Sequence, residues 1–303
     1  MTVVGFHELM AHAEQERYAV GYFECWNLES LMAVADAAES ARSPVLLGFS
    51  GIYLPHPQRL RTEPPSVYAA LGLEVCREIA VPAGLVFNES PHLEKVLEAV
   101  QQGYGLVMYS DDRLASGEQV EMVRRAVEAA HCAGAAVEGE SSALPGVGGD
   151  LDEMPDQVAF TEVQTALDFI DKTGVDAFAV NIGQMHLHGR REVQLDLERL
   201  GELHEAVEVP LVLHGASSVS RQDLAEAVQL GIRKINVGSA LKQAYFKHLR
   251  AACADVDPGY NPYEVIGSGL SEDVLMAGRI ALQREVEELI QLFGSTGKAD
   301  SIG

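Results

Sequence analysis

The segment Val209–Ser218 places an imidazole and a glycine directly after a short apolar run. The run, Leu211–Leu213, is typical of a strand buried on both faces of a parallel sheet. His214 and Gly215 follow it, and a helix is predicted to begin after Ser220, which has an acidic residue three positions later. The imidazole and the exposed amides of the loop therefore lie between the carboxyl end of a strand and the start of a helix, where α/β proteins bind ligands.

Further histidines and carboxylates are predicted at the ends of other strands. His186 and His188 are two residues apart, so they lie on the same side of an extended segment. A single such histidine is more often a surface or capping residue. Imidazoles from two strand ends with carboxylates nearby, however, favour a divalent transition metal, zinc first. The candidate acidic or polar strand ends are Asn88, Glu89, Ser110, Asp111, Asp112, Glu138 and Glu140.

Two glycine- and serine-containing loops predict a phosphate site. Gly215 and Ser217 follow one predicted strand, whereas Asn236 and Ser239 follow the next, and both loops begin helices. Backbone N–H groups at helix N-termini bind anions, and barrels commonly bind phosphate at the loops after strands 7 and 8. Each loop alone is a weak signal, but together they predict a phosphorylated ligand.

These residues must be positioned by alternating strands and helices, which the hydrophobic pattern predicts along the whole chain. The predicted strands are 19–23, 44–49, 81–87, 105–109, 135–140, 175–182, 210–213 and 232–237. The predicted helices are 28–41, 66–79, 92–102, 118–133, 162–172, 193–206, 221–229, 240–253 and 271–293. About eight βα units predict an α/β fold, a (β/α)8 TIM barrel, in preference to a doubly wound sheet.

No low-complexity linker divides the chain, so we expect residues 1–303 to form a single domain with an extra C-terminal helix. Three connections are long, namely 51–65, 141–157 and 257–270. The first two follow strands and therefore lie on the face where barrels carry their active sites.

Composition restricts the partners. The formal net charge is −23, from 45 acidic and 22 basic residues, and this predicts no nucleic-acid binding. The mean hydropathy is +0.03 and no apolar run is long enough to span a bilayer. The N-terminus shows no signal-peptide pattern, and the four cysteines have no CxxC spacing, so we expect reduced thiols in a cytoplasmic protein.

The motifs resemble those of the class II (metal-dependent) fructose-bisphosphate and tagatose-bisphosphate aldolases. Residues 210–218 read PLVLHGASS, similar to the family's PLVLHGGSG, and residues 234–239 read KINVGS, similar to K-I-N-V/I-x-T. Residues 174–183, GVDAFAVNIG, resemble the segment that leads to a metal-binding histidine. Residues 137–140 resemble VEAE and residues 293–299 match F-G-S-x-G-K-A. The resemblance covers almost the whole chain.

The resemblance implies a zinc ion that polarises a ketose carbonyl, with a carboxylate moving the hydroxyl proton as the carbon–carbon bond breaks. It implies that His214 is a metal ligand and that Gly215, Ser217, Asn236 and Ser239 bind the phosphate of a dihydroxyacetone-phosphate-like donor. The second imidazole ligand is His186 by spacing or His188 by its His-Gly dipeptide, and we favour His186. Family members are dimers or tetramers, so a homodimer or homotetramer is expected.

The chain departs from the family at the end of the third strand. Where the family has H-L-D-H-G, residues 86–90 read VFNES, so Asn88 replaces the catalytic aspartate and Glu89 replaces a zinc-binding histidine. An asparagine cannot act as the general acid or base. Glu89 is still a possible ligand, because His2Glu is a known catalytic zinc set. It adds negative charge and so leaves the identity of the metal open.

The departures leave three hypotheses for function. One is an aldolase-type lyase that uses Glu89 as a ligand and Glu140, Asp112 or an acid of the loop 141–157 for proton transfer. Another is a related metal-enolate enzyme, such as an isomerase, an epimerase or an aldolase for another sugar phosphate. The third is a non-catalytic sugar-phosphate-binding descendant.

Tyr22 and Trp26, near the end of the first predicted strand, either shape the pocket or pack in the core.

Overall fold

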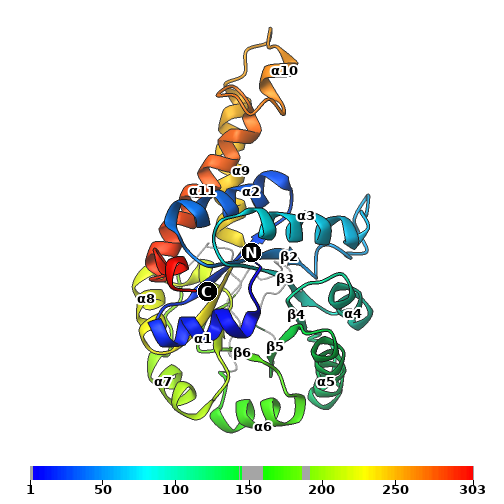
Figure 1. Cartoon of the computed structure of the whole chain (residues 1–303), viewed down its shortest axis with the longest axis vertical. Helices are drawn as coiled ribbons and strands as arrows, with labels where there is room; N and C mark the ends of the chain where they lie inside the picture. Colours follow the sequence, from blue (N-terminus) through cyan, green and yellow to red (C-terminus); the bar gives the residue numbers. More distant parts are fainter. Residues whose placement is uncertain (1–2, 143, 145–159, 186–191, 303) are drawn as a thin grey trace.

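The computed structural model describes residues 3–142, 144, 160–185 and 192–302. Eight parallel strands pair in chain order and close into a barrel, which confirms the predicted (β/α)8 fold and excludes the doubly wound sheet (Figure 1). The strands are β1 Val20–Cys25, β2 Val45–Ser50, β3 Ala83–Ser90, β4 Leu106–Tyr109, β5 Ala136–Glu140, β6 Ala177–Val180, β7 Leu211–Leu213 and β8 Ile232–Val237.

Helices surround the barrel, and their apolar faces pack on the outside of the strands to form the main core. They are α1 Phe6–Glu16, α2 Leu28–Ala41, α3 Pro65–Glu78, α4 Leu93–Gln101, α5 Ser116–Cys132, α6 Val163–Thr173, α7 Leu197–Ala206, α8 Arg221–Gln229, α9 Ser239–Ala254, α10 Pro262–Val265 and α11 Val274–Leu292, with 3-10 turns η1 Ala216–Ser218 and η2 Lys298–Ser301. Among the described helices, none is long and apolar enough to cross a membrane.

Local sequence signals fix several helix ends. The Ser220 hydroxyl accepts the backbone N–H of Asp223 at 3.0 Å and caps α8, as predicted. The Asn27 side chain accepts the N–H of Ser30 at 2.9 Å and begins α2. The helix predicted over 193–206 is shorter than expected, because Val193 pairs with Val219 and α7 begins only after Asp196.

Two helices, α1 and α10, were not predicted from the sequence. α1 covers the amino-terminal end of the barrel, where Phe6, Leu9 and Met10 close a buried apolar cluster inside the strands. Its first residue follows Gly5, which offers no capping side chain, so the start signal is weak. α10 lies within the segment predicted as the loop 257–270. α9 and α11 pack side by side and extend from the barrel with α10 near their tip (Figure 1).

The barrel interior is divided into an apolar and a polar layer. Towards the amino-terminal end it holds apolar side chains such as Leu46, Leu106 and Val212. Towards the carboxyl ends of the strands it holds buried polar side chains, namely Ser50, Asn88, Glu138, Glu140, His214, Lys234 and Asn236. Buried polar groups require partners, so this second layer locates the candidate site.

Candidate functional site

A cavity with a volume of about 340 Å³ opens at the carboxyl ends of the strands. The ends of β1, β2, β3, β7 and β8 contribute to its wall, together with the loop that follows β2. Six of the predicted metal-binding or phosphate-binding positions line it, namely Glu89, His214, Gly215, Ser217, Asn236 and Ser239. Asn88 lines it as well. The cavity thus combines the predicted metal-binding and phosphate-binding positions.

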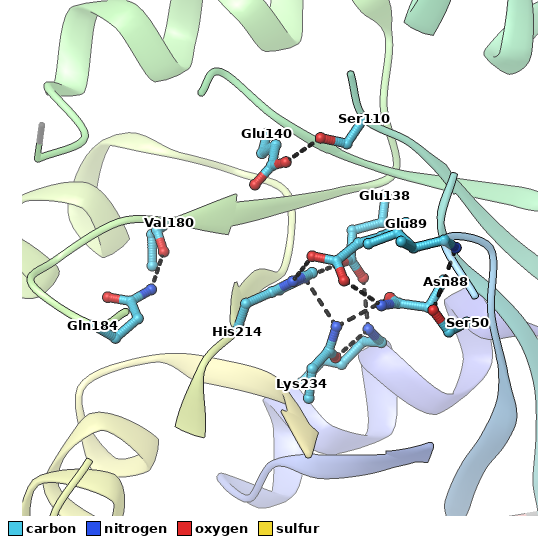
Figure 2. A network of polar contacts seen from close by, with 12 residues as sticks. Ser50, Asn88, Glu89, Ser110, Glu138, Glu140, Val180, Gln184, His214 and Lys234 are labelled. Atoms are coloured by element: carbon cyan, nitrogen blue, oxygen red, sulfur yellow. Dashed lines mark hydrogen bonds and ion pairs between the residues drawn. The ribbon is translucent and has the colours of Figure 1, made fainter. Parts of the chain in front are cut away.

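His214 lies between two carboxylates, one on each side of its ring (Figure 2). Its Nδ1 is 2.9 Å from Oε1 of Glu89, and its Nε2 is 2.5 Å from Oε1 of Glu138. Burial by itself lowers the pKa of His214, but the charge of Glu89 and the hydrogen bond to Glu138 raise it to about 10. A pKa of about 10 favours an imidazolium at neutral pH, whose two nitrogens can donate to these carboxylates.

Lys234 is a buried cation that sequence reasoning did not assign to the site. Its Nζ donates to Oε2 of Glu138 at 2.7 Å and to Oδ1 of Asn236 at 2.5 Å. Burial lowers the pKa of Lys234, whereas Glu138 opposes the shift. Burial raises the pKa of Glu138, but the charges of Lys234 and His214 outweigh it and hold that pKa at about 2. Glu138 is therefore an ionised bridge between two cations.

Asn88 and Asn236 connect this network to Glu89. Nδ2 of Asn236 donates to Oδ1 of Asn88 at 3.2 Å, and Nδ2 of Asn88 donates to Oε2 of Glu89 at 3.0 Å. Glu89 has a positive φ of 49° and lies at an irregularity in the β3–β4 pairing. Such a conformation costs on the order of 1 kcal/mol or more for a residue other than glycine. The bend directs the Glu89 carboxylate to His214.

The buried Glu140 forms a separate pair with the half-buried Ser110 (Figure 2). The Ser110 hydroxyl donates to Oε1 of Glu140 at 2.5 Å. Burial raises the pKa of Glu140 to about 7, with the positive charge of His214 acting in the opposite direction. A carboxyl with a pKa near neutrality can gain and lose a proton under physiological conditions, which is what general acid–base catalysis requires.

Asp112, the other acid considered for proton transfer, is exposed. It borders a smaller cavity of about 160 Å³ that shares Ile52 and Glu89 with the larger one and also includes Ser110. The neighbouring Asp111 is held by Arg113, whose Nε donates to Oδ1 of Asp111 at 2.7 Å. The structure therefore brings Glu140, rather than Asp112, close to the buried network.

The two predicted phosphate loops meet at the start of α9. The Ser217 hydroxyl accepts the backbone N–H of Ala240 at 3.1 Å, so the loop after β7 is fastened to the helix after β8. Gly215 has a φ of +66°, and an added Cβ would lie 3.1 Å from the carbonyl oxygen of Met185. A glycine is therefore required for this turn. Asn236 differs from the other predicted phosphate ligands, because its side chain belongs to the buried network.

The remaining histidine candidates, His186 and His188, lie outside the described residues, as do the acids at 150 and 152. Gln184 is fully buried just before them and hydrogen-bonds through its side chain to the carbonyl of Val180 (Figure 2). Its Oε1 accepts the backbone N–H of Ile182 at 2.9 Å. These bonds hold the segment directly after β6, which precedes the predicted ligands in the sequence.

The donor set at Glu89 and His214 fits a divalent cation. Within the described part of the chain, no group of three or more histidine, cysteine or acidic side chains is arranged to hold a metal. Glu89 and His214 nevertheless approach within 2.9 Å, so a carboxylate oxygen and an imidazole nitrogen converge. To hold a metal with Glu89, the His214 ring would have to be neutral, because only a neutral imidazole ligates. With His186, these residues would complete the predicted His2Glu set.

The outer wall of the cavity contains a charged pair that sequence reasoning also missed. Nζ of Lys242 forms an ion pair with Glu24 and lies 5.6 Å and 5.2 Å from the ring centroids of Trp26 and Tyr53. Lys242 is on the first turn of α9, three residues after Ser239. Side chains of a helix lean towards its N-terminus, so this spacing could have indicated that Lys242 reaches the cavity.

The sequence matches a known enzyme family over almost its whole length. The family model for class II fructose-bisphosphate aldolase matches residues 4–298. A fructose-bisphosphate aldolase of Geobacillus stearothermophilus is 31% identical over 300 residues, covering 99% of both chains. A sulfofructosephosphate aldolase of Alkalicoccus urumqiensis is 29% identical over 299 residues, again covering 99% of both chains.

A solved structure shows the same likeness in three dimensions. The YdjI aldolase of Escherichia coli K12 superposes with a TM-score of 0.78 at 27% identity, covering 98% of this chain and 99% of that one. The resemblance that the motifs indicated is thus confirmed over nearly the full length. The chain belongs to the class II fructose-bisphosphate aldolase family and is a divergent class II aldolase-like carbon–carbon lyase.

Proposed function

We propose that the protein is a metal-dependent lyase that cleaves a phosphorylated ketose with a dihydroxyacetone-phosphate-like donor half. One observation carries this proposal: the Glu89–His214 pair and the two helix-starting loops line the same cavity. A phosphate at the start of α9 and a ketose carbonyl near His214 would then belong to one ligand.

The proposed metal ligands are Glu89, His186 and His214. The bound ion, zinc or another divalent metal, supplies a Lewis acid that polarises the ketose carbonyl. Asn88 holds the Glu89 carboxylate by its hydrogen bond, so in this chain it positions a ligand and does not move a proton. Glu138 and Lys234 fix the opposite side of the His214 ring.

Proton transfer is assigned to Glu140. Its pKa of about 7 suits it to accept the proton of the substrate hydroxyl whose carbon loses the bond. Ser110 joins Glu140 to the smaller cavity, which contacts the larger one at Glu89. Asp112, exposed at the same cavity, is the alternative acid.

The experiment is a cleavage assay of the metal-loaded protein with a panel of ketose phosphates. The panel includes ketoses with a distal phosphate and with a distal sulfonate, because relatives bear the names of both types of aldolase. We expect release of dihydroxyacetone phosphate from at least one ketose, with wild-type activity reduced by more than a hundredfold in His214→Ala. Retention of activity in His214→Ala would contradict the proposal.

A second candidate function is an isomerisation or epimerisation on the same metal-enolate platform. The specific observation is that position 88, where the family has its catalytic aspartate, carries an amide whose oxygen and nitrogen are both hydrogen-bonded inside the site. Product analysis distinguishes the two functions, since an isomerase converts the ketose without releasing a three-carbon phosphate.

We also propose a homo-oligomer, a dimer or a tetramer, and a cytoplasmic location. The arm of α9, α10 and α11 carries exposed apolar side chains that support the oligomer, namely Phe246, Tyr260, Tyr263, Ile266 and Leu270. Cys25, Cys76, Cys132 and Cys253 are free thiols, in keeping with a reducing compartment.

A further inference from the structure

Tyr22 has a buried hydroxyl without a hydrogen-bond partner among the described residues. The side chain belongs to β1 and is 1% exposed. In a folded protein the large majority of buried polar side-chain atoms have a partner, because an unpaired one loses its hydrogen bonds to water without replacement. The hydroxyl therefore calls for a partner that the described residues do not supply.

Tyr22 is one of the residues that line the larger cavity, and it pairs in register with Asn236 of β8. Residues in register on parallel strands face the same side of the sheet, so Tyr22 and Asn236 both face the barrel interior. The Lys234 ammonium lies 5.1 Å from the centroid of the Tyr22 ring. The ring thus has a cation–π partner, whereas the hydroxyl has no hydrogen-bond partner among the described residues.

The protonation state of Tyr22 limits what its hydroxyl can do. Burial raises the pKa of Tyr22 well above its ordinary value, and the acidic neighbours Glu24 and Glu89 add to this shift. The phenol therefore stays neutral and acts as a hydrogen-bond donor rather than as a base.

We propose that the Tyr22 hydroxyl is a substrate-binding group that donates a hydrogen bond to an oxygen atom of a ketose phosphate in this cavity. This inference rests on the proposed function, because a sugar phosphate is the ligand that supplies such an oxygen. The described residues leave this hydroxyl without a partner, and an oxygen atom of the ligand would supply one.

The chain offers matched controls. Tyr104 is 2% exposed and its hydroxyl is also buried without a described partner, but it is not part of the cavity wall. Tyr18 is fully buried, and its hydroxyl is 3.0 Å from Nδ1 of His12. Replacement of each tyrosine by phenylalanine removes one oxygen atom and retains the ring, including the contact of Tyr22 with Lys234.

The experiment compares Tyr22→Phe, Tyr104→Phe and Tyr18→Phe with the wild type in two measurements. The first is urea unfolding without ligand. We expect the midpoint of Tyr22→Phe to be equal to or higher than that of the wild type, as for Tyr104→Phe, whereas Tyr18→Phe unfolds at lower urea. A lower midpoint for Tyr22→Phe would show that its hydroxyl already has a partner, and would overturn the inference.

The second measurement is the dissociation constant of dihydroxyacetone phosphate, determined by calorimetry on metal-loaded protein of known metal content. We expect binding to Tyr22→Phe to be about tenfold to a hundredfold weaker at unchanged metal content, and binding to Tyr104→Phe to equal the wild type. Equal binding by Tyr22→Phe and wild type overturns this inference alone, as does a lower metal content in Tyr22→Phe. A wild type that binds none of this ligand overturns the proposed function together with it.

Discussion

The amide nitrogen of Asn88 donates a hydrogen bond to the carboxylate of its sequence neighbour Glu89, with 3.0 Å between Nδ2 and Oε2. Adjacent residues of a regular strand face opposite sides of the sheet, and only the positive φ of Glu89 allows this contact. The two departures from the family motif are thus physically coupled: the carboxylate at position 89 is held by the amide at position 88.

We therefore expect Asn88→Asp to lower activity. The substitution would place two carboxylates at hydrogen-bond distance, where both cannot be ionised, and Glu89 would bind a metal less well. Steady-state kinetics on the ketose identified in the cleavage assay should show kcat/KM reduced about tenfold or more at pH 7. Asn88→Ala is the matched control without the added charge. A large gain in Asn88→Asp would instead mean that the family's usual chemistry is merely suppressed.

The double substitution Asn88→Asp with Glu89→His recreates both residues of the family motif. We expect it to recover activity relative to Asn88→Asp alone, because the second carboxylate is removed. The same kinetic assay gives the coupling between the two positions. Strictly additive effects would show that the Asn88–Glu89 hydrogen bond has no influence on the reaction.

Metal content is predicted to depend on Glu89 and His214. Elemental analysis of the purified protein should find about one divalent ion per chain, and Glu89→Ala and His214→Ala should each lose it. His204→Ala, which changes a histidine on α7 outside the cavity, serves as the control. Absence of any metal under all loading conditions would refute the metal-enolate mechanism.

The pH dependence of turnover should report Glu140. If its carboxylate is the base, kcat rises with pH through an apparent pKa of about 7 and then levels off. Glu140→Gln should abolish this rise. The Ser110 hydroxyl stabilises the ionised form, so Ser110→Ala should move the rise to higher pH. An unchanged profile in Ser110→Ala would argue for another base.

The raised pKa of Glu140 also makes the free energy of unfolding depend on pH. The pKa of Glu140 is about 7 in the folded protein, against 4.5 for an unperturbed glutamate. Between these values the folded state keeps a proton that the unfolded state releases, so the contribution of Glu140 to the free energy of unfolding is full below pH 4.5 and declines towards pH 7. Urea titrations at several pH values should show this decline in the free energy of unfolding of the wild type and not in that of Glu140→Gln.

Removal of the Lys234 cation should destabilise the metal-free protein strongly. Lys234→Met leaves the buried Glu138 carboxylate without one of its two cationic partners, which typically costs about 3–5 kcal/mol for a buried pair. The double variant Glu138→Gln with Lys234→Met should lose less than the sum of the single losses, as measured by urea unfolding. Additive losses would show that the pair is not energetically coupled.

Oligomerisation through the arm can be tested at its most exposed side chain. Tyr263 on α10 is 87% exposed, so a charged residue there should not affect folding of the barrel. Light scattering should show a dimer or tetramer for the wild type and smaller species for Tyr263→Glu combined with Ile266→Lys. An unchanged mass would remove the arm from the interface.

The sequence alone determined the fold and several residues of the cavity wall. The alternation of apolar runs and helical patterns is a local property, and eight such units close a barrel whose strand ends necessarily converge. His214, Gly215, Ser217 and Ser239 follow directly from that rule, because each lies just beyond a predicted strand. α1 was missed because its start lacks a capping side chain.

The tertiary structure decided which of the polar residues act on one another. Lys234 lies inside a strand in an apolar context, and nothing local distinguishes it from a surface lysine; only closure of the barrel brings Glu138 within 2.7 Å of it. Likewise, the pKa of Glu140 and the unpaired Tyr22 hydroxyl are properties of burial, which depends on residues distant in sequence. Sequence spacing specifies where side chains emerge from strands, whereas partnership and desolvation are set by the packing of all eight strands together.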